Sequence, residues 1–417
     1  MEKTGKKVLI VGQSACEYSL AKKMLELDEV AEIFVTPGND AVKEFATAID
    51  IRESNIQELL EFVLENAIDF TVATSEEAIR ADIASIFQEN NQMIFAPTKM
   101  SANIALSKSV GKKFMYKTRI PVPKFGIFDK SNMAIDYAKK SVMPIVVKTD
   151  KHQKEGVFIC NSFPMAKNFI ESLFDTGEKR IIIEDYILGH EFSFYVITDG
   201  YQALPLGIVA NYKHGLDGDG GALTSGMGAF TPDYKISKEI EDKILGQIVF
   251  PALDTLAKQQ MPYVGILGID LILNDREQFY AIEFNSFLKN PDCQVILPTI
   301  RENIYKLFEA CVIGSFADDY EKIDISDDAV ASCVLYARKE DSVIYGLEDL
   351  DDETIISHFN TRKNKYLEYE TLGDQTIAIT RKAKVLSKAV DDLYDEISVI
   401  NFDGMKYRKD IGKTILK

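Results

Sequence analysis

The sequence predicts a multidomain protein of mixed α/β and α+β class. Its 417 residues are enough for about two to four domains, each with its own core. Between residues 6 and 97, short apolar strands alternate with amphipathic helices, which is typical of an open parallel sheet. From residue 325 on, strands are followed by a helix, which is typical of a small α+β domain.

The first domain is expected over residues 1–98. Its strands are predicted at 6–12, 31–36, 67–74 and 92–97, and its helices near 17–27, 54–66 and 76–90. Because ligands of open parallel sheets bind beyond the carboxyl ends of the strands, Gly12 and Asn39 are candidate substrate contacts. Ser14 and Glu17 stand where a dinucleotide fingerprint needs glycine, which argues against a nicotinamide or flavin site.

The second domain is expected over residues 99–324 and the third over 325–417. In the second, helices are predicted near 101–118, 164–174 and 236–258, and strands at 144–150, 156–160, 180–187, 191–198 and 203–210. In the third, strands are predicted near 331–337, 366–371 and 376–380, and a helix near 387–396. These patterns contain no internal repeat.

The segment 265–285 indicates a hairpin that carries acids among apolar residues. If its turn centres on residues 276–277, Asp270 lies directly opposite Glu283, and Asn285 shares a face with Glu283. Two carboxylates so close in an apolar setting need a cation between them, and oxygen ligands suit Mg²⁺ or Mn²⁺. The alternative is a hairpin whose acids face solvent or pair with Lys or Arg.

Two lysines and two acidic strand ends are further candidates. Lys148 ends an apolar strand and could reach a phosphate as a point charge, as could Lys108 on the preceding helix. Glu184 ends another strand and Glu191 begins the next, where carboxylates can accept from an adenine amino group or ribose hydroxyls. The alternatives are a lysine that extends to solvent from a strand end and a solvated acidic strand end.

The segment 214–230 is unusually rich in glycine. Glycine permits positive φ and close approach of the backbone, so successive N–H groups can surround an anion. Seventeen ordered residues without regular structure are uncommon unless they function, so we expect a substrate-binding loop here. The alternative is a mobile surface hinge.

Composition excludes several classes of function. The formal net charge of −17, from 65 acidic and 48 basic residues, disfavours nucleic acid or an anionic membrane as a general partner. No apolar run approaches the length of a spanning helix. The five cysteines are scattered without CxxC spacing and the four histidines are dispersed, which predicts reduced thiols, a cytoplasmic location and no His-ligated metal.

The order of these pieces resembles the ATP-grasp superfamily, and within it a divergent member of the phosphoribosylamine–glycine ligase family. The resemblance covers essentially the whole chain and implies a central ATP-grasp fold, with a mobile nucleotide lid within 120–190. The matching segments are 37–39, 96–99, 107–108, 144–148, 217–219, 226–232, 283–285 and 402–412.

The resemblance also implies roles for individual residues. Lys108 and Lys148 would contact ATP phosphates and act in catalysis, with Lys154 in the phosphate-covering loop. The residues implied to hold adenine are Glu184, Asp185, Tyr186 and Ile187, and Glu191 would hold the ribose. Glu283 and Asn285 would bind Mg²⁺, joined by Asp270, although the ligases usually have Gly there. The acceptor pocket would include Lys213, Asp217, Gly218, Asp219, Gly226, Met227, Gly228 and Lys289.

Several positions depart from the family pattern. The first glycine-rich loop lacks two glycines, the arginine and the histidine, and the loop 149–156 is poor in glycine. An arginine expected to hold an anionic group is Phe287 here, which removes a charge-assisted hydrogen bond of roughly 1.5–3 kcal/mol. Lys289 restores charge without the forked geometry.

We therefore expect an ATP- and Mg²⁺-dependent carboxylate–amine ligase that works through an acyl phosphate, with glycine and 5-phosphoribosylamine as first-choice substrates. Its partners are expected to be small molecules, with no nucleic acid and no membrane, and the chain a monomer or homodimer. The alternatives are a ligase for another amino acid and amine, a non-catalytic relative that binds nucleotide or nothing and, on the N-terminal rhythm alone, a dinucleotide oxidoreductase.

Overall fold

The computed structural model describes residues 5–150 and 156–413. Its first unit is a five-stranded parallel sheet in the order β3-β2-β1-β4-β5, so the predicted open parallel sheet is confirmed. The strands are β1 (Lys6–Gly12), β2 (Val30–Pro37), β3 (Thr47–Ala48), β4 (Phe70–Ala73) and β5 (Ile94–Phe95). The helices are α1 (Ala15–Leu25), α2 (Ile56–Glu65), α3 (Glu76–Arg80) and α4 (Ile83–Glu89).

Two predicted helices are each broken by one residue. The helix expected at 76–90 divides at Asp82, which takes a left-handed conformation with φ 64°. The helix expected at 101–118 divides at Ser107, which is extended (φ −132°, ψ 117°) and accepts from the Val110 N–H. The second break gives α5 (Lys99–Leu106) and α6 (Lys108–Lys117), and it places Lys108 in the first turn of a new helix.

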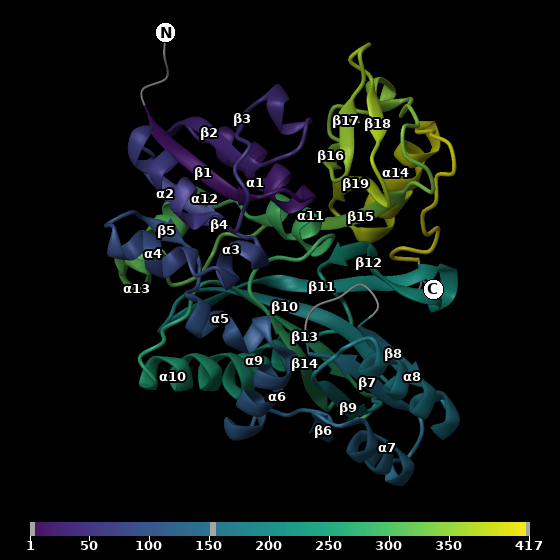
Figure 1. Cartoon of the computed structure of the whole chain (residues 1–417). Coiled ribbons are helices and arrows are strands. Elements are labelled where there is room, and N and C mark those ends of the chain that lie inside the picture. Colours follow the sequence, from purple (N-terminus) through teal and green to yellow (C-terminus); the bar gives the residue numbers. More distant parts are fainter. Residues whose placement is uncertain (1–4, 151–155, 414–417) are drawn as a thin grey trace.

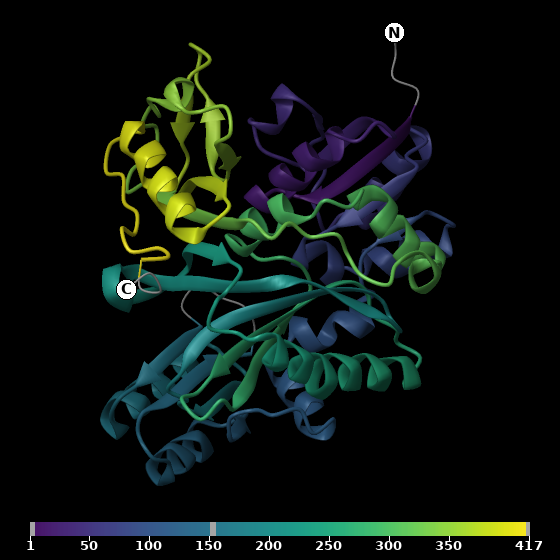
Figure 2. The ribbon, with the colours of Figure 1, turned by 180° about the vertical axis from the view of Figure 1, so that it is seen from behind.

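A small subdomain follows, made of a four-stranded antiparallel sheet in the order β6-β9-β7-β8 with α7 and α8 packed on it. Its elements are β6 (Phe125–Phe128), α7 (Ser131–Lys140), β7 (Ile145–Thr149), β8 (Val157–Cys160), α8 (Phe163–Asp175) and β9 (Ile181–Asp185). The sequence pattern did not indicate β6 or α7. In Figures 1 and 2 this subdomain lies at the opposite end of the molecule from the N-terminal sheet.

The largest sheet has eight strands in the order β14-β13-β10-β11-β12-β15-β19-β16. Its central strands are β10 (His190–Asp199), β11 (Ala203–Leu216), β12 (Gly220–Thr231), β13 (Val264–Leu273) and β14 (Phe279–Asn285). The C-terminal strands are β15 (Ala329–Tyr336), β16 (Ile355–His358) and β19 (Gln375–Ala383). Because β12 pairs with β15, the C-terminal region continues the central sheet by main-chain hydrogen bonds.

Helices and a small hairpin complete the chain (Figure 2). The predicted helix 236–258 is continuous but includes a π-helical segment between α9 (Lys238–Ile244) and α10 (Phe250–Lys258). The others are α11 (Asp292–Ile296), α12 (Ile304–Ile313), α13 (Phe316–Asp319) and α14 (Leu386–Val399), and β17 (Thr361–Lys363) pairs with β18 (Tyr369–Thr371). Among the described residues, no helix has the length and apolar character needed to cross a membrane.

The glycine-rich segment 214–230 is not the irregular loop that we expected. It forms the end of β11 and most of β12, joined by a tight turn at Asp217–Asp219. Gly218 and Asp219 both have positive φ in that turn, at 68° and 55°. Gly226 has φ 118° and lies so close to Pro291 that a side chain would collide with it. In this paired hairpin, Gly218 lies in the turn and Gly226 lies in close contact with Pro291. A high number of glycines therefore did not indicate an irregular loop here.

A C-terminal clasp, residues 408–412, holds the tip of this β11–β12 hairpin. Arg408 is 1% exposed, lies over the Tyr212 ring and donates to Asp219 at 2.8 Å and to Asp410 at 2.6–2.7 Å. The Gly218 N–H donates to Asp410, and the Lys409 N–H donates to Asp217. These bonds tie the C-terminal segment to the turn of the β11–β12 hairpin.

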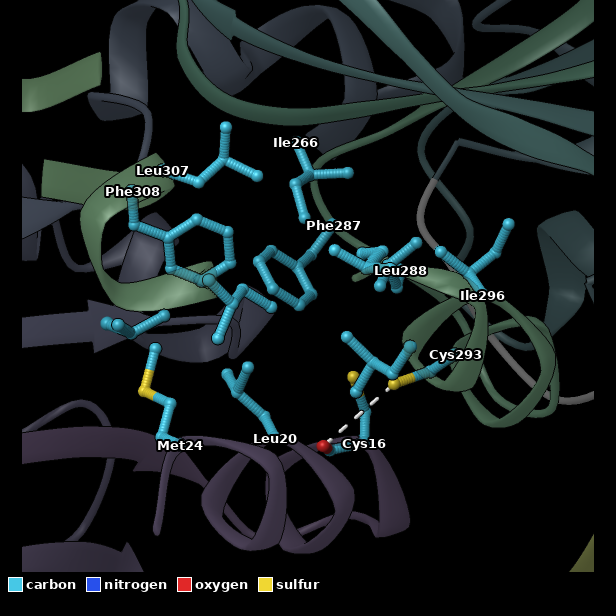
Figure 3. Packing of buried hydrophobic residues seen from close by; sticks show 14 of the residues in the cluster. Cys16, Leu20, Met24, Ile266, Phe287, Leu288, Cys293, Ile296, Leu307 and Phe308 are labelled. Atoms are coloured by element: carbon cyan, nitrogen blue, oxygen red, sulfur yellow. Dashed lines mark hydrogen bonds between the residues drawn. The ribbon is translucent and has the colours of Figure 1, made fainter. Parts of the chain in front are cut away.

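Phe287 belongs to the hydrophobic core that joins the N-terminal unit to the central sheet. Figure 3 shows its ring among Ile266 from β13 and Leu307 and Phe308 from α12, with Leu20 of α1 nearby. Only 6% of the residue is exposed. Where the family pattern has an arginine for an anionic group, this chain therefore has a core residue. All five cysteines are free and buried.

Phe287→Ala is expected to lower the free energy of unfolding by about 3–5 kcal/mol, because it removes a packed ring from the core. Urea denaturation followed by circular dichroism measures the change. Phe250→Ala is the control, because that ring is 46% exposed and its loss should change stability by less than about 0.5 kcal/mol. Equal stabilities for the two variants would contradict the core assignment.

Candidate active site

A cavity of about 300 Å³ lies between the small subdomain and the central sheet. Of the residues predicted from the sequence, those that line it are Lys148, Glu184, Asp185, Tyr186, Ile187, Glu191, Lys213, Gly226, Asp270, Glu283 and Lys289. Apolar side chains also line it: Pro123, Val146, Val157, Ile159, Leu223, Leu271, Ile272, Ile282 and Pro291. The cavity thus combines an apolar lining, which suits the faces of a flat ring, with a dense set of charges.

Glu184 lies buried between two lysines. Its Oε2 is 2.9 Å from Lys148 Nζ and its Oε1 is 3.1 Å from Lys112 Nζ, and all three residues are at most 5% exposed. Burial raises the pKa of Glu184, but the two lysines outweigh it and the pKa lies below its ordinary value. Burial lowers the pKa of Lys112 to about 8, whereas Glu184 and Glu283 offset burial and raise the pKa of Lys148. Lys148 is therefore held as a cation.

The acidic hairpin has the predicted register at the decisive position. Asp270 on β13 pairs with Glu283 on β14, and Gly268 pairs with Asn285. The register shifts by one residue between Asp270 and Leu271, so Ile282 is an extra residue in β14. Lys108, from the first turn of α6, lies 3.0 Å from Glu283. The structure therefore brings both predicted lysines and both predicted acids to one place.

Asp270 is surrounded by donors. Lys289 Nζ lies 2.6 Å from both of its oxygens and Lys213 Nζ lies 3.2 Å from Oδ2, while Ser193 and Asn285 donate to Oδ1. Burial raises the pKa of Asp270, but Lys213 and Lys289 outweigh it and lower the pKa below its ordinary value. The sequence left open the alternative that the acids of this hairpin pair with Lys or Arg, and Asp270 does pair with lysine.

The donor set still suits a hard divalent cation bound together with phosphates. The Asn285 amide donates through Nδ2 to Asp270, which leaves its Oδ1 as an acceptor two positions after Glu283 in β14. Mg²⁺ is usually held by one or two protein oxygens plus substrate phosphates and water. Among the described residues, no group of three or more His, Cys, Asp or Glu side chains could hold a metal by itself.

Several predicted residues lie outside the cavity. Asn39 donates to the carbonyls of His358 and Phe359, so its amide binds the C-terminal region. Gly12 packs against the buried Glu17 side chain, where a Cβ atom would collide. Asp217, Gly218 and Asp219 contact the clasp, Met227 is buried, and Gly228 packs on Ile411. Lys154 lies outside the described residues.

The charged or polar residues that sequence reasoning missed at the cavity and its ion pairs include Lys112, Asn211 and Asp292. Lys112 lies four positions after Lys108 on α6, so helical spacing could have indicated it. Asn211 and Asp292 come together only through the pairing of β10 with β11 and the fold of residues 286–292. No local signal marks that contact.

Comparison with known proteins decides the family. The model described as "Phosphoribosylglycinamide synthetase, N domain" matches residues 6–105, and the one described as "Phosphoribosylglycinamide synthetase, ATP-grasp (A) domain" matches residues 106–293. The chain belongs to the phosphoribosylglycinamide synthetase family. The phosphoribosylamine–glycine ligase of Clostridium acetobutylicum is 30% identical, over 98% of this chain and 100% of the relative. That of Caldanaerobacter subterraneus is 32% identical, over 97% and 99%.

Solved structures show the same fold. The phosphoribosylamine–glycine ligase of Thermotoga maritima superimposes with a TM-score of 0.82 at 22% identity, over 97% of this chain and 99% of that one. The biotin carboxylase domain of Hydrogenobacter thermophilus 2-oxoglutarate carboxylase, solved with MgADP, gives 0.73 at 16% identity, over 96% and 91%. The ATP-grasp fold of this family member, expected from the resemblance, is thereby confirmed.

Glu184→Gln is expected to destabilise the protein by about 3–5 kcal/mol at pH 7, because it leaves two buried lysines without a counter-ion. The folded pKa of Glu184 lies below its ordinary 4.5, so its stabilisation is present above pH 4.5 and is lost as the pH falls through the folded pKa. The difference between wild type and variant should therefore shrink in acid. Urea denaturation at a series of pH values measures it.

The matched control is Asp175→Asn, an exposed acid in the same subdomain. Its stability should follow that of the wild type at every pH. A gap between wild type and Glu184→Gln that stays constant down to pH 3 would contradict the ion-pair account.

Proposed function

We propose that this protein is an ATP- and Mg²⁺-dependent carboxylate–amine ligase that joins glycine to 5-phosphoribosylamine. ATP would phosphorylate the glycine carboxylate to give an acyl phosphate, and the amine nitrogen would then displace phosphate to leave an amide. The observation that carries the proposal is a pair of ion pairs at the charged cavity of a chain in this family. Lys148 pairs with Glu184, and both line the cavity, while Lys108 pairs with Glu283 of the cavity wall. Phosphoryl transfer depends mainly on such positioning and charge neutralisation.

The nucleotide would lie between the small subdomain and the central sheet. Val146, Val157 and Ile159 of the small subdomain offer an apolar face for adenine, and the 184–187 strand end offers backbone groups at its edge. Glu191 would accept from the ribose. Lys148 and Lys108 would exchange their present carboxylate partners for phosphate oxygens, which keeps each lysine neutralised in both situations.

Glu283 and Asn285 would hold the magnesium ion, which supplies charge neutralisation to the phosphates when bound. Asp270 would serve mainly to hold Lys213 and Lys289 in place, since both of its oxygens accept from them. These two lysines would attract the carboxylate of the acid substrate. The hairpin residues near Gly226 would close the substrate end of the cavity.

The substrates are small molecules, and the proposed setting is the cytoplasm, in purine biosynthesis. The scattered, buried thiols of the chain agree with a reducing compartment.

Purified protein with Mg·ATP, glycine and freshly formed 5-phosphoribosylamine is expected to release ADP, and omission of either substrate should abolish most of the release. A coupled assay for ADP measures it. A panel of other amino acids and amines is the control for substrate identity. No turnover with any pair, together with no thermal shift from Mg·ATP, would leave only the non-catalytic alternative.

Glu283→Gln is expected to raise the Mg²⁺ concentration needed for half-maximal activity by at least about tenfold, because it removes an anionic oxygen from the ion. Titration of Mg²⁺ at fixed ATP measures the change. Asp275→Asn, in the exposed turn of the same hairpin, is the control and should leave the titration unchanged. An unchanged Mg²⁺ requirement in Glu283→Gln would refute the assignment of Glu283 to the metal.

A further inference from the structure

Basic residues are concentrated in one segment of the chain. Residues 108–148 contain ten Lys and Arg but only two Asp and Glu, a net charge of +8 in a chain of net −17, so the rest of the chain carries −25. Three of the ten lie in the ion pairs of the cavity, namely Lys108, Lys112 and Lys148. The other seven are exposed, and we call them the basic face: Lys113, Lys117, Arg119, Lys124, Lys130, Lys139 and Lys140.

The side chains of the basic face lack acidic partners. In the part of the chain that the structure describes, none of the seven has a carboxylate within ion-pair distance. On α9 and α10, by contrast, exposed lysines pair within their own helices, since Lys243 lies 2.7 Å from Glu239 and Lys258 lies 2.6 Å from Asp254. The basic face therefore has positive charge available for a partner of opposite charge.

The basic face spans neighbouring elements. Figures 1 and 2 show α6, β6 and α7 together at the lower end of the molecule. Arg180 and, more weakly, Lys113 lower the pKa of Asp129, so Lys113 on α6 lies near the connection between β6 and α7. Tyr116 on α6 is 71% exposed, and its ring centre is 6.2 Å from that of Phe125 on β6. An exposed tyrosine among basic side chains suits a protein partner, because interfaces are enriched in Tyr and Arg.

An acidic face lies in the C-terminal region. The segment 347–353 holds five acids and no base, and Asp391 and Asp395 lie one turn apart on α14. The segment lies beside α14, because Glu396 accepts from the Asp351 N–H at 3.0 Å and from the Thr354 hydroxyl at 2.8 Å. The acidic face comprises the five exposed acids of this region that have no ion pair within residues 5–150 and 156–413: Glu348, Asp349, Asp352, Asp391 and Asp395.

The two faces lie too far apart to meet within one molecule. In both views α6 and α7 are at the lower end and α14 is at the upper end. Contact between the faces therefore joins two molecules, and since the faces differ, the arrangement is head-to-tail. At about 0.1 M salt, charges more than about 10 Å apart are largely screened. The net charge of the whole chain therefore opposes the contact only weakly, and the charges that touch decide it.

We propose that the basic face of one molecule binds the acidic face of a second molecule, so that this protein assembles head-to-tail. The charge of the chain favours this occupant over nucleic acid, because a polyanion that extends beyond the basic face meets a chain that is otherwise of net −25. The acidic face is a compact set of exposed acids that fits the basic face without such repulsion. Because α6 belongs to the body and α7 to the small subdomain, a bound molecule contacts both parts that enclose the cavity. The proposal does not depend on the ligase function.

Sedimentation velocity over a range of protein concentrations tests the proposal. The wild type is expected to associate at about 0.1 M salt, and its apparent dissociation constant should rise at least about tenfold at about 1 M salt, where the Debye length is about 3 Å. One variant neutralises three bases of the basic face: Lys113→Gln, Lys117→Gln and Lys124→Gln. A second variant neutralises three acids of the acidic face: Asp349→Asn, Asp352→Asn and Asp391→Asn. Each variant alone should associate at least about tenfold more weakly than the wild type.

A mixture of the two variants gives the sharpest measurement. The first variant keeps its acidic face and the second keeps its basic face, so each pair of molecules retains one intact combination of faces. The mixture is expected to form a 1:1 complex that does not grow when the concentration is raised. The wild type keeps both faces on every molecule, so its assemblies should grow with concentration or close into a ring.

Matched controls carry the same changes of charge on the N-terminal unit, outside both faces. One removes three exposed bases: Lys6→Gln, Lys43→Gln and Arg52→Gln. The other removes three exposed acids of α2: Glu58→Gln, Glu61→Gln and Glu65→Gln. Both controls should associate like the wild type. Circular dichroism and thermal unfolding establish that each variant is folded, and if the variant of one face does not fold, the variant of the other face still gives the measurement.

Each other outcome overturns the proposal. A wild type that stays monomeric in the low-salt buffer refutes it, and binding of poly-L-glutamate or RNA by that monomer would assign the basic face to another partner. Association that survives neutralisation of either face refutes it, as does a mixture that forms no 1:1 complex. Equal loss of association in the control variants would show a general effect of net charge and would also refute it.

Discussion

Charge balance inside the cavity is the constraint on which the structure depends. Glu184, Asp270 and Glu283 each have at least one lysine within 3.2 Å, in places where an unpaired carboxylate would be costly. The partners come from different elements: Lys112 on α6 and Lys148 on β7 meet at Glu184 on β9. The ion pairs therefore fix how the small subdomain meets the rest of the chain, in addition to neutralising the acids.

The same ion pairs also suit an exchange of partners when ligands bind. A lysine held by a carboxylate can pass to a phosphate without ever being left unpaired, and the released carboxylate can pass to a metal ion. Such an exchange needs no large change in net charge, which suits a cavity bounded by apolar strands. Asp270 differs, because its two lysines and two further donors leave it little freedom.

Much of the fold could be predicted because its signals are local. The alternation of strands and helices predicted the N-terminal sheet. A polar turn between two strands, whose side chains alternate with a period of two, predicted that Asp270 lies opposite Glu283. The extra residue Ile282 does not change that pairing. The errors arose where distant contacts decide. Glycines in 214–230 indicated a loop, but pairing with β15 and the clasp makes a hairpin. Ser107 divides a helix because Asp150, which directly follows β7, accepts from the Ser107 hydroxyl and the Ser109 N–H.

Residues of the candidate site could be recognised in the sequence where they lie at strand ends or in motifs. Lys148, Glu184 and Glu283 met those conditions. Asn39 also follows a strand end, but its amide donates to backbone carbonyls of the C-terminal region. A sequence pattern does not predict such a long-range contact. Asn211 and Asp292 carried no local mark, since their contact follows from the arrangement of β10, β11 and residues 286–292. Phe287 shows the limit of motif comparison, because a changed residue can leave the site altogether and join the core.

The C-terminal clasp has a consequence for the order in which the molecule matures. Arg408 and Asp219 are 189 positions apart, so the ribosome finishes the hairpin tip long before its anchor exists. Until then the side chains of Asp217 and Asp219 and the Gly218 N–H lack their partners in the clasp, although β11 and β12 can already pair. The hairpin tip therefore takes its final bonds only when residues 408–412 are in place.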